Sequence, residues 1–518
     1  MTPVLHETPL GKSYETFSDF IASAEESEAD QGIIRLWRHF DNLSRIPRNT
    51  GKEVEARDYA VKFARERKNR SFEYEIDGAG NLLIIIPASE GLENKAGIVL
   101  QGHLDMVCAG KPDPSVYGVK PKVDDSGEWV YADNTTLGAD NGIGISAMLS
   151  VADEEHKHGP IALIFTVREE AIDDGASHMD FKNELQGFEY LLNLDSEDGG
   201  KATISSASTQ DAFIDLPVYF EEIGERTIWK LQVSNLQGGH SGEDIGENRM
   251  NALKILGGFF ENLSDSKSEF SMNIVHIGGG SVHNAIPSEA ELYFTAVGED
   301  GNSLTEEEIR VWTDSIRNGI NISRYNLDDK KRINIMLEES AAGSELVMDN
   351  KSSERVINLI SRLAHGAYNL SEKSEIMLSV NLATVRTERD EVKIVSMIRG
   401  NEKWLTEAMI EEINKISREH GGSFSKSNFY PGWQADPEAE INSIAGKAWR
   451  QVTGTELELG SSHCSLECGQ IIRKYPQLQA ISLGAVIEGG HTIEERVNIR
   501  SVGILFEFVK KFVGAVPS

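Results

Sequence analysis

Two adjacent glutamates, Glu169 and Glu170, stand where an apolar segment ends, in the sequence IALIFTVREEAIDDGA (161–176). The apolar part is short, continuous and rich in Ile, Val and Phe, which is typical of a buried β-strand. An acidic pair after a strand is most often a solvated loop. The residues that end the other apolar segments decide whether this pair has a chemical role.

Histidines and carboxylates also end other apolar segments: His103 and Asp105 in IVLQGHLD, Asp195 in YLLNLDSED, and His491 in ISLGAVIEGGH. The spacing of two places His103 and Asp105 on the same side of an extended strand. Asp140 in LGADNGIG begins a predicted helix, which Asp140 or Asn141 would cap. Ligands bind at the carboxyl ends of strands in open α/β sheets. A set of His and carboxylate side chains without thiolates indicates a hydrolytic site for Zn²⁺, Mn²⁺ or Co²⁺.

Composition excludes several classes of function. The formal net charge of −32 argues against a nucleic-acid partner and against an anionic membrane, because phosphate binding needs a basic surface. The first residues contain no secretory signal pattern, and no apolar run is long enough to span a bilayer. Three cysteines in 518 residues do not form a disulfide framework. We therefore expect a cytoplasmic protein.

The order of predicted elements indicates two domains, as the length of 518 residues also does. After an acidic N-terminal extension (1–30), helices alternate with strands through residues 31–208, which predicts a mixed, mainly parallel α/β sheet. Residues 209–428 contain the order strands, helix, strands twice. This segment is predicted to be an inserted, internally duplicated α+β lid domain, and residues 429–518 to complete the catalytic domain.

Eight sequence features in this order carry a family resemblance: GHLDMV, LGADNGIG, EE…GA, LNLDSED, GGHSGEDI, HNAIP, HCSLECG and a late His after a strand. Together they resemble the di-zinc dipeptidase and aminoacylase family of metallopeptidases. The closest branch is that of the aminoacyl-histidine (Xaa-His) dipeptidases, also called peptidase D. The resemblance extends over residues 30–515.

The resemblance implies a two-metal site and a role for each of its residues. His103 and Asp195 would hold one divalent cation, Glu170 and His491 the other, and Asp140 would bridge them. Asp105 would fix the tautomer of His103. The cations, Zn²⁺ or else Mn²⁺ or Co²⁺, would activate a bridging water and polarise the scissile carbonyl. Glu169 would act as the general base, and His240 could donate to the developing oxyanion. The predicted contacts to the substrate are Asn284, Arg399 and Ser465.

The expected function is hydrolysis of dipeptides, either Xaa-His such as β-Ala-His or a broader range, by a homodimer formed through the lid domain. An N-acyl-amino-acid amidohydrolase or a tripeptidase on the same scaffold would share every ligand, and the need for a free α-amino group would separate them. A non-catalytic binding protein is the alternative from another class. The presence of both Glu169 and Asp140 argues against it.

Overall fold

The computed structural model describes residues 14, 16–26, 30–66, 72–154, 156–171, 175–265, 270–319, 327–340, 344–369 and 376–516. The chain folds into two compact units. The first unit comprises residues 1–206, 433–462 and 466–518, and the second comprises residues 207–432 and 463–465. Each unit has its own sheet and its own hydrophobic core.

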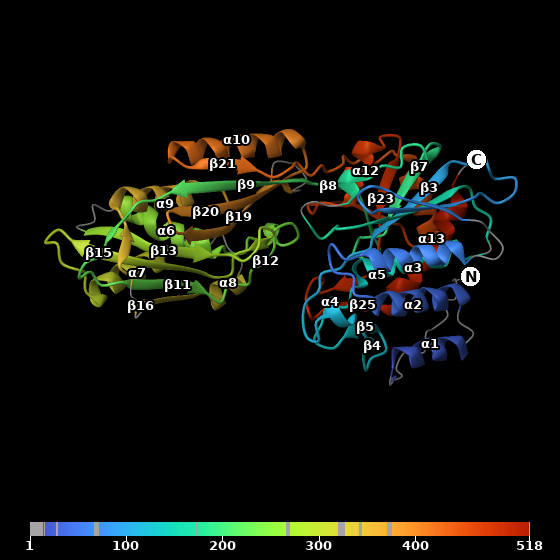
Figure 1. The fold of residues 1–518 in the computed structure, drawn as a ribbon, viewed down its shortest axis with the longest axis horizontal. Helices are drawn as coiled ribbons and strands as arrows, with labels where there is room; N and C mark the ends of the chain where they lie inside the picture. The colour runs from blue at the N-terminus through green and yellow to red at the C-terminus, as the bar shows by residue number, and fades with distance from the viewer. Residues whose placement is uncertain are drawn as a thin grey trace. The chain divides into compact units, whose positions relative to one another are not determined.

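An eight-stranded sheet forms the centre of the first unit, in the order β1-β2-β6-β3-β7-β23-β8-β22. Figure 1 labels four of these strands, β3, β7, β8 and β23. Strands β6, β3, β7 and β23 are parallel neighbours, whereas β1, β2 and β8 bring antiparallel pairings. The strands are β1 (Glu73–Ile76), β2 (Leu82–Ile86), β3 (Gly97–His103), β6 (Ile161–Thr166), β7 (Phe188–Asn193), β8 (Lys201–Ser206), β22 (Glu458–Ser462) and β23 (Gln479–Ser482).

Both faces of this sheet are buried, as expected for strands with continuous apolar runs. Alternate residues belong to two core clusters: Leu82 and Ile84 pack on one side, and Leu83 packs on the other. The helices of the first side are α2 (Gln31–Ser44), α3 (Val54–Arg65), α5 (Ala139–Ala152), α11 (Glu440–Thr453) and α13 (Ile499–Ala515). The second side is covered by α12 (Glu467–Lys474) and the short helix η1 (Ala176–His178).

A smaller four-stranded sheet in the first unit has the order β24-β25-β5-β4. Its strands are β4 (Pro121–Val123), β5 (Trp129–Ala132), β24 (Ile487–Glu488) and β25 (Arg496–Asn498), and the short helix α4 (Pro114–Tyr117) precedes them. Strand β25 pairs with β5, so the sheet joins a hairpin near residue 130 to one near the end of the chain. That second hairpin carries the loop with His491.

The N-terminal segment contains helix α1 (Phe17–Glu26), which is part of the core rather than only a surface extension. Phe17 and Phe20 are 3% and 2% exposed. Both rings pack edge-on against Trp37 of α2, with centroids 5.8 and 5.7 Å apart. Other residues of the predicted 1–30 extension, including 1–13 and 27–29, lie outside the described residues.

The second unit is built on a nine-stranded antiparallel sheet, in the order β16-β11-β15-β13-β19-β20-β9-β21 with β18 beside β19 (Figure 1). These strands are β9 (Ser208–Pro217), β11 (Trp229–Ser234), β13 (Phe270–Gly279), β15 (Ala290–Gly298), β16 (Asn334–Glu339), β18 (Gly366–Asn369), β19 (Ile376–Glu388), β20 (Glu391–Gly400) and β21 (Ser423–Lys426). Two short pairs complete the unit: β10 (Phe220–Glu222) with β17 (Leu346–Met348), and β12 (Gly239–His240) with β14 (Ala285–Ile286).

Helices supply the other layer of the second unit: α6 (Ala252–Asp265), α7 (Glu306–Gly319), α9 (Asn350–Arg362) and α10 (Lys403–Glu419). Apolar residues of these helices, such as Leu256, Leu359 and Ile410, share one core with the sheet. The short helices are η2 (Ile245–Glu247) and α8 (Leu327–Arg332). The mixed α/β class and the α+β second unit agree with the sequence prediction, and its internal duplication stays a prediction.

Helix α9 ends at Arg362, because Leu363 is extended and Gly366, with φ of +112°, begins β18. One sequence prediction about the elements is wrong. Neither Asp140 nor Asn141 caps α5: the N-cap is Gly138, no side chain caps it, and both residues have non-helical backbone angles. Their side chains bond elsewhere, as described below.

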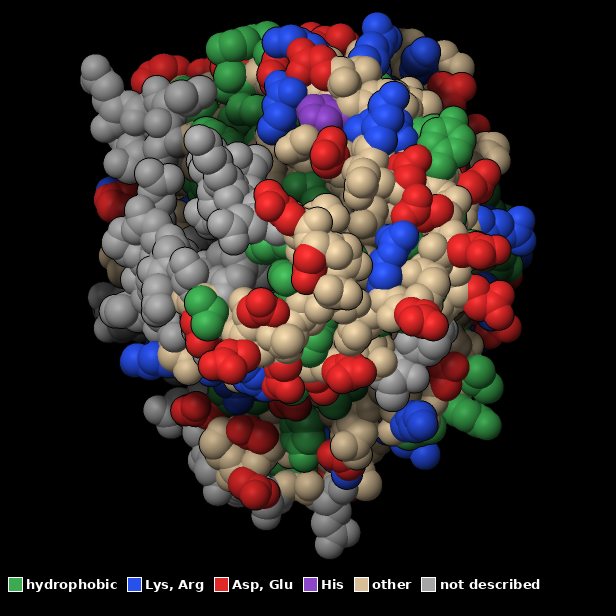
Figure 2. Space-filling view, turned by 90° about the vertical axis from the view of Figure 1, so that its left-hand side faces the viewer, with side chains coloured by type: hydrophobic (Ala, Val, Ile, Leu, Met, Phe, Trp, Pro, Cys, Tyr) green, Lys and Arg blue, Asp and Glu red, His purple; other side chains and the backbone are tan. Residues whose placement is uncertain are grey.

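The surface agrees with the acidic composition. Figure 2 shows Asp and Glu side chains spread over one face, with Lys and Arg between them. Among the described residues, no helix combines the length and the apolar character that crossing a membrane requires.

Candidate metal centre

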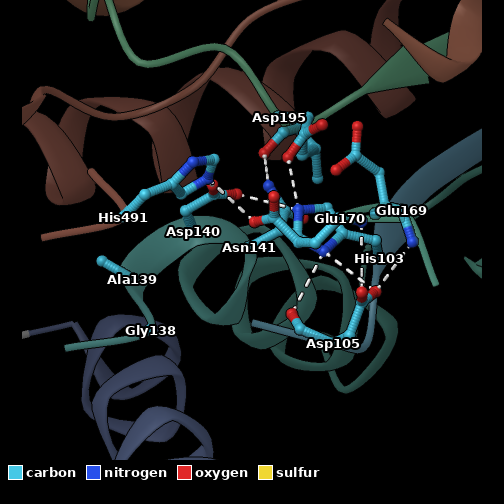
Figure 3. Close-up of polar contacts among 12 residues, drawn as sticks. His103, Asp105, Gly138, Ala139, Asp140, Asn141, Glu169, Glu170, Asp195 and His491 are labelled. Carbon is cyan, nitrogen blue, oxygen red and sulfur yellow. Dashed lines mark hydrogen bonds and ion pairs between the residues drawn. The ribbon is translucent and has the colours of Figure 1, made fainter. Parts of the chain in front are cut away.

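The first half of the site is built around His103, the last residue of β3, whose ring is 1% exposed. Its Nε2 lies 2.8 Å from Oδ1 of Asp140 and 3.1 Å from Oδ1 of Asp195 (Figure 3). Its Nδ1 lies 3.1 Å from the backbone carbonyl of Asp105. Asp195 comes two residues after the end of β7, the parallel neighbour of β3, so adjacent strand ends position the pair.

The second half of the site is built around His491 (Figure 3). Its Nε2 lies 3.0 Å from Oδ2 of Asp140 and 2.9 Å from Oε1 of Glu170. Asp140 therefore directs one carboxylate oxygen to each histidine. His491 does not end the strand β23, as the sequence suggested, but lies in the loop of the β24–β25 hairpin with φ of +63°.

The polar atoms of this cluster fit divalent cations better than they fit one another. Each Nε2 faces two carboxylate oxygens, but one N–H group donates a well-directed hydrogen bond to only one of them. Accordingly, Oδ1 of Asp195 and Oε1 of Glu170 are buried without a hydrogen bond. A cation between one imidazole nitrogen and two carboxylate oxygens would satisfy all three atoms. Atoms of His103, Asp140 and Glu170 lie within 4.8 Å of one another, which allows such coordination.

The electrostatics of the cluster show how closely its groups interact. Burial opposes the charged form of His103, but the carboxylates of Asp195 and Asp140 raise its pKa well above the usual value. The side chain of His491 is 46% exposed, so desolvation opposes its charged form less strongly, and its pairing with Asp140 and Glu170 raises its pKa to about 12. Burial raises the pKa of Asp195 to about 6. A cation bound to either imidazole would therefore replace a proton there.

The two glutamates of the opening motif follow β6 in a turn. The strand ends at Thr166, and Arg168 has φ of +57°, so the chain leaves the strand direction before both glutamates. Asp105 holds this turn: its Oδ1 accepts from the Glu169 N–H at 3.0 Å and its Oδ2 from the Glu170 N–H at 3.1 Å. Burial and then the neighbouring carboxylates raise the pKa of Glu169 well above its usual value.

The loop that carries Asp140 is held by two buried charged residues that the sequence analysis missed. Glu495 accepts hydrogen bonds from four consecutive backbone N–H groups, those of residues 137–140, at 2.7 to 3.3 Å. Arg48 donates to the carbonyls of Leu104, Asp105 and Gly138. Neither residue follows a strand or belongs to a quoted motif. The sequence carries no separate signal for them, and they stand out only in the structure, as charged residues at buried positions.

Asn141 is fixed beside this loop. Its Nδ2 donates to the carbonyl of Leu194 at 2.7 Å. A Cβ atom at Gly102 or at Gly144 would lie 2.2 or 2.4 Å from its Oδ1, so both positions require glycine. Gly102 and Gly144 therefore allow close packing around the site.

Comparison with known proteins identifies the family. Residues 231–314 match the family described as a peptidase dimerisation domain. The cytosol non-specific dipeptidase of Escherichia coli K12 is 31% identical over 501 residues, which cover 93% of this chain and 98% of that protein. The chain belongs to the M20 family of metallopeptidases. The resemblance predicted from the motifs is thereby confirmed.

Solved structures agree with this assignment. The aminoacylhistidine dipeptidase of Vibrio alginolyticus is 29% identical, with a TM-score of 0.76 and coverage of 94% of this chain and 97% of that chain. A tripeptidase of Staphylococcus aureus is 18% identical, with a TM-score of 0.53 and coverage of 93% and 98%, and shows the fold alone. As an M20 peptidase, this protein is a hydrolase that acts on peptide bonds.

The predicted oxyanion donor of this M20 peptidase and its three predicted substrate contacts all lie in the second unit. His240 pairs with Ala285 between β12 and β14, and the carbonyl of Asn284 accepts from the N–H of Ser241 at 2.8 Å. Arg399 is 5% exposed and donates to the hydroxyls of Ser241 and Thr209. Thr209 in turn shares a hydrogen bond with Ser465. The structure thus connects Arg399 with Ser465 through one hydroxyl.

Arg399 has a further property that suits a substrate contact. None of the carboxylates that the structure describes forms an ion pair with it. A buried guanidinium whose partners are only hydroxyls has unused capacity for a bidentate bond to a carboxylate.

Proposed function

We propose that this M20 peptidase is a two-metal dipeptidase that cleaves Xaa-His dipeptides such as β-Ala-His, with a broad range of other dipeptides as secondary substrates. The observation that carries the proposal is the shared carboxylate of Asp140, with one oxygen facing His103 and the other facing His491. The substrate class follows from the names of the relatives in E. coli and V. alginolyticus.

In this proposal the five clustered residues hold two divalent cations, preferably Zn²⁺. His103 and Asp195 would bind one cation, Glu170 and His491 the other, and Asp140 both. When bound, the cations would lower the pKa of a water molecule and polarise the scissile carbonyl. The acidic surroundings in the first unit favour such cations because they supply the compensating charge.

Glu169 is the proposed general base. It takes a proton from the attacking water and gives it to the leaving amine. The raised pKa of Glu169 matches this use, because a base that later acts as an acid works best with a pKa near the operating pH. Asp105 positions both glutamates through their backbone N–H groups, so that Glu170 is free to bind a cation while Glu169 moves the proton.

For the second unit we propose that His240 stabilises the oxyanion and that Asn284, Arg399 and Ser465 bind the carboxylate or carbonyl of the substrate. The buried guanidinium of Arg399 supports a carboxylate contact, which every dipeptide offers at its C-terminus. The peptidase dimerisation match over 231–314 supports a homodimer. Sedimentation should give about twice the chain mass of 57.2 kDa. The name of the E. coli relative supports a cytoplasmic location.

A substrate panel tests the function. β-Ala-His, Ala-His, Gly-Leu, a tripeptide and an N-acetyl amino acid are incubated with the protein loaded with Zn²⁺, Mn²⁺ or Co²⁺, and again after chelation. Chelator-sensitive hydrolysis of the dipeptides, fastest for the two that end in His, is the expected result. Hydrolysis of only the tripeptide or only the acetylated substrate would replace the dipeptidase with a tripeptidase or an amidohydrolase. No hydrolysis with any metal would contradict an enzymatic function.

A further inference from the structure

We propose that His240, Glu243 and Cys464 form a further binding site, distinct from the two-metal centre, for a thiophilic divalent cation such as Zn²⁺ in the second unit. Nδ1 of His240, which faces Cys464, would be the ligand, and Nε2 would be the donor proposed for the oxyanion. All three residues belong to this unit, whereas the catalytic centre lies in the first. One donor atom from each residue lies within 4.8 Å of the other two. Thiolate, imidazole and carboxylate form a donor set that binds Zn²⁺ or Co²⁺ and discriminates against Mg²⁺ and Mn²⁺.

The distance between sulfur and nitrogen fits a common cation. Sγ of Cys464 lies 3.6 Å from Nδ1 of His240. A tetrahedral zinc ion, with bonds of about 2.3 Å to sulfur and about 2.0 Å to nitrogen, holds these two atoms about 3.5 Å apart. Two of the three donors, the sulfur and the imidazole nitrogen, therefore lie at the spacing that a zinc ion requires.

The backbone leaves room for the thiol. A Cβ atom at Gly242 would lie 2.5 Å from Sγ of Cys464 and 3.2 Å from Cε1 of His240. Glycine at this position thus creates the space that both donors share. His240 and Cys464 are half-buried and Glu243 is exposed, so a cation bound here would be accessible from solvent. The site is consequently open to exchange of the cation.

Both chain segments that carry the donors are fixed by other contacts. In the segment around His240, the backbone N–H of His240 donates to Asp244 at 2.7 Å. Arg249 donates to the carboxylate of Asp244 and to the carbonyl of Gly238. In the segment around Cys464, His463 bonds Ser379 at 2.8 Å, and Ser465 donates to the carbonyl of Ala207. Little conformational freedom remains to be lost on binding, which favours affinity.

Arg399 places a positive charge beside this site. It lies close enough to interact electrostatically with both Cys464 and Glu243. A neighbouring guanidinium stabilises the thiolate over the thiol, and the thiolate is the form that binds a cation. It also reduces the negative potential at the site. We therefore expect an affinity below that of the carboxylate-rich catalytic centre, so that the site fills after that centre does.

Cobalt spectroscopy tests the site directly. The proposed catalytic ligands are all nitrogen and oxygen, so a sulfur-to-cobalt charge-transfer band reports only a thiolate ligand. Titration of the metal-free protein with Co²⁺ should give this band after the catalytic centre is filled, and added Zn²⁺ should abolish it. Cys464→Ser should lose the band and bind one equivalent of metal fewer.

Two further variants make the result specific. Cys108→Ser changes a half-buried cysteine of the first unit and should keep the band. Glu243→Gln changes an exposed side chain and should weaken cobalt binding at this site by at least tenfold without loss of the fold. Absence of the band at saturating Co²⁺, or its persistence in Cys464→Ser, would overturn the proposal. Because every readout is binding, failure of the proposed dipeptidase activity would leave the test intact.

Discussion

At the scale of single residues, Asp105 holds Glu169, the proposed base, and Glu170, a proposed metal ligand, in one turn. Replacing the carboxylate of Glu169 with an amide removes the proton acceptor but no proposed metal ligand. Glu169→Gln should therefore lower kcat by a factor of about 10²–10⁴ and leave the metal content unchanged. Steady-state kinetics and elemental analysis measure the two effects. Glu170→Gln is the control, since it should lose metal, and near-normal turnover in Glu169→Gln would refute the base assignment.

Glu495 affects the site without touching a proposed substrate or metal. Its buried carboxylate accepts from the N–H groups of residues 137–140 and so positions Asp140. Glu495→Gln turns part of that acceptor into a donor, so the loop must shift. We expect metal affinity to fall about 10- to 100-fold, which is typical when the partner of a ligand is lost. Competition with a chromogenic chelator measures this, and exposed Glu494→Gln serves as the control. Equal affinities in both variants would exclude a positioning role.

At the scale of elements, the sequence predicts the strands that carry ligands and misses what lies between them. The apolar runs that become β3, β6 and β7 are continuous, so their ends, with His103 and Asp195, are visible without a structure. Local patterns contain no information about the β24–β25 hairpin that presents His491. Arg48 and Glu495 are separated from Asp140 by long stretches of chain, and only the tertiary fold brings them to one loop.

The junction of α6 and α9 in the second unit gives a prediction about pH. Asn251 caps α6 through its Oδ1, and its Nδ2 lies 3.1 Å from Nδ1 of His365. Burial, together with the charge of Lys254, lowers the pKa of His365 to about 3. In the unfolded chain, where a histidine has a pKa of about 6.5, His365 binds a proton below that pH. In the folded chain His365 stays neutral over the same range. His365 therefore lowers the free energy of unfolding as the pH falls from about 6.5 towards 3.

Thermal unfolding of the second unit measures this effect. Between pH 7 and pH 5, the Tm of His365→Asn should fall less than the Tm of the parent protein. Asparagine still offers an acceptor to Asn251, but it does not titrate. His178→Asn, at an exposed position, should keep the parent's pH dependence. Identical slopes for the parent and His365→Asn would show that His365 is not the titrating group.

At the scale of the whole molecule, the chain passes between the two units more than once. Residues 463–465 belong to the second unit although they lie between segments of the first. This arrangement places the proposed catalytic ligands in one unit, and Arg399, Ser465 and the His240–Glu243–Cys464 site in the other. Because each unit has its own core, the two units can unfold separately. A single free energy of unfolding then does not describe the chain.

Loading the protein with Mn²⁺ should distinguish the unfolding transition of the first unit from that of the second. Mn²⁺ prefers the carboxylates and imidazoles of the catalytic centre to a thiolate site, so it should bind the first unit alone. A ligand present at 100 times its Kd stabilises the unit that binds it by about 2.7 kcal/mol. Calorimetry of the metal-free and Mn²⁺-loaded protein should therefore show an increase of several degrees in one transition and no change in the other. Hydrogen exchange of peptides from β3 and β20 assigns the two transitions. A shift of both transitions together, or of the one that contains β20, would mean that the units do not unfold independently.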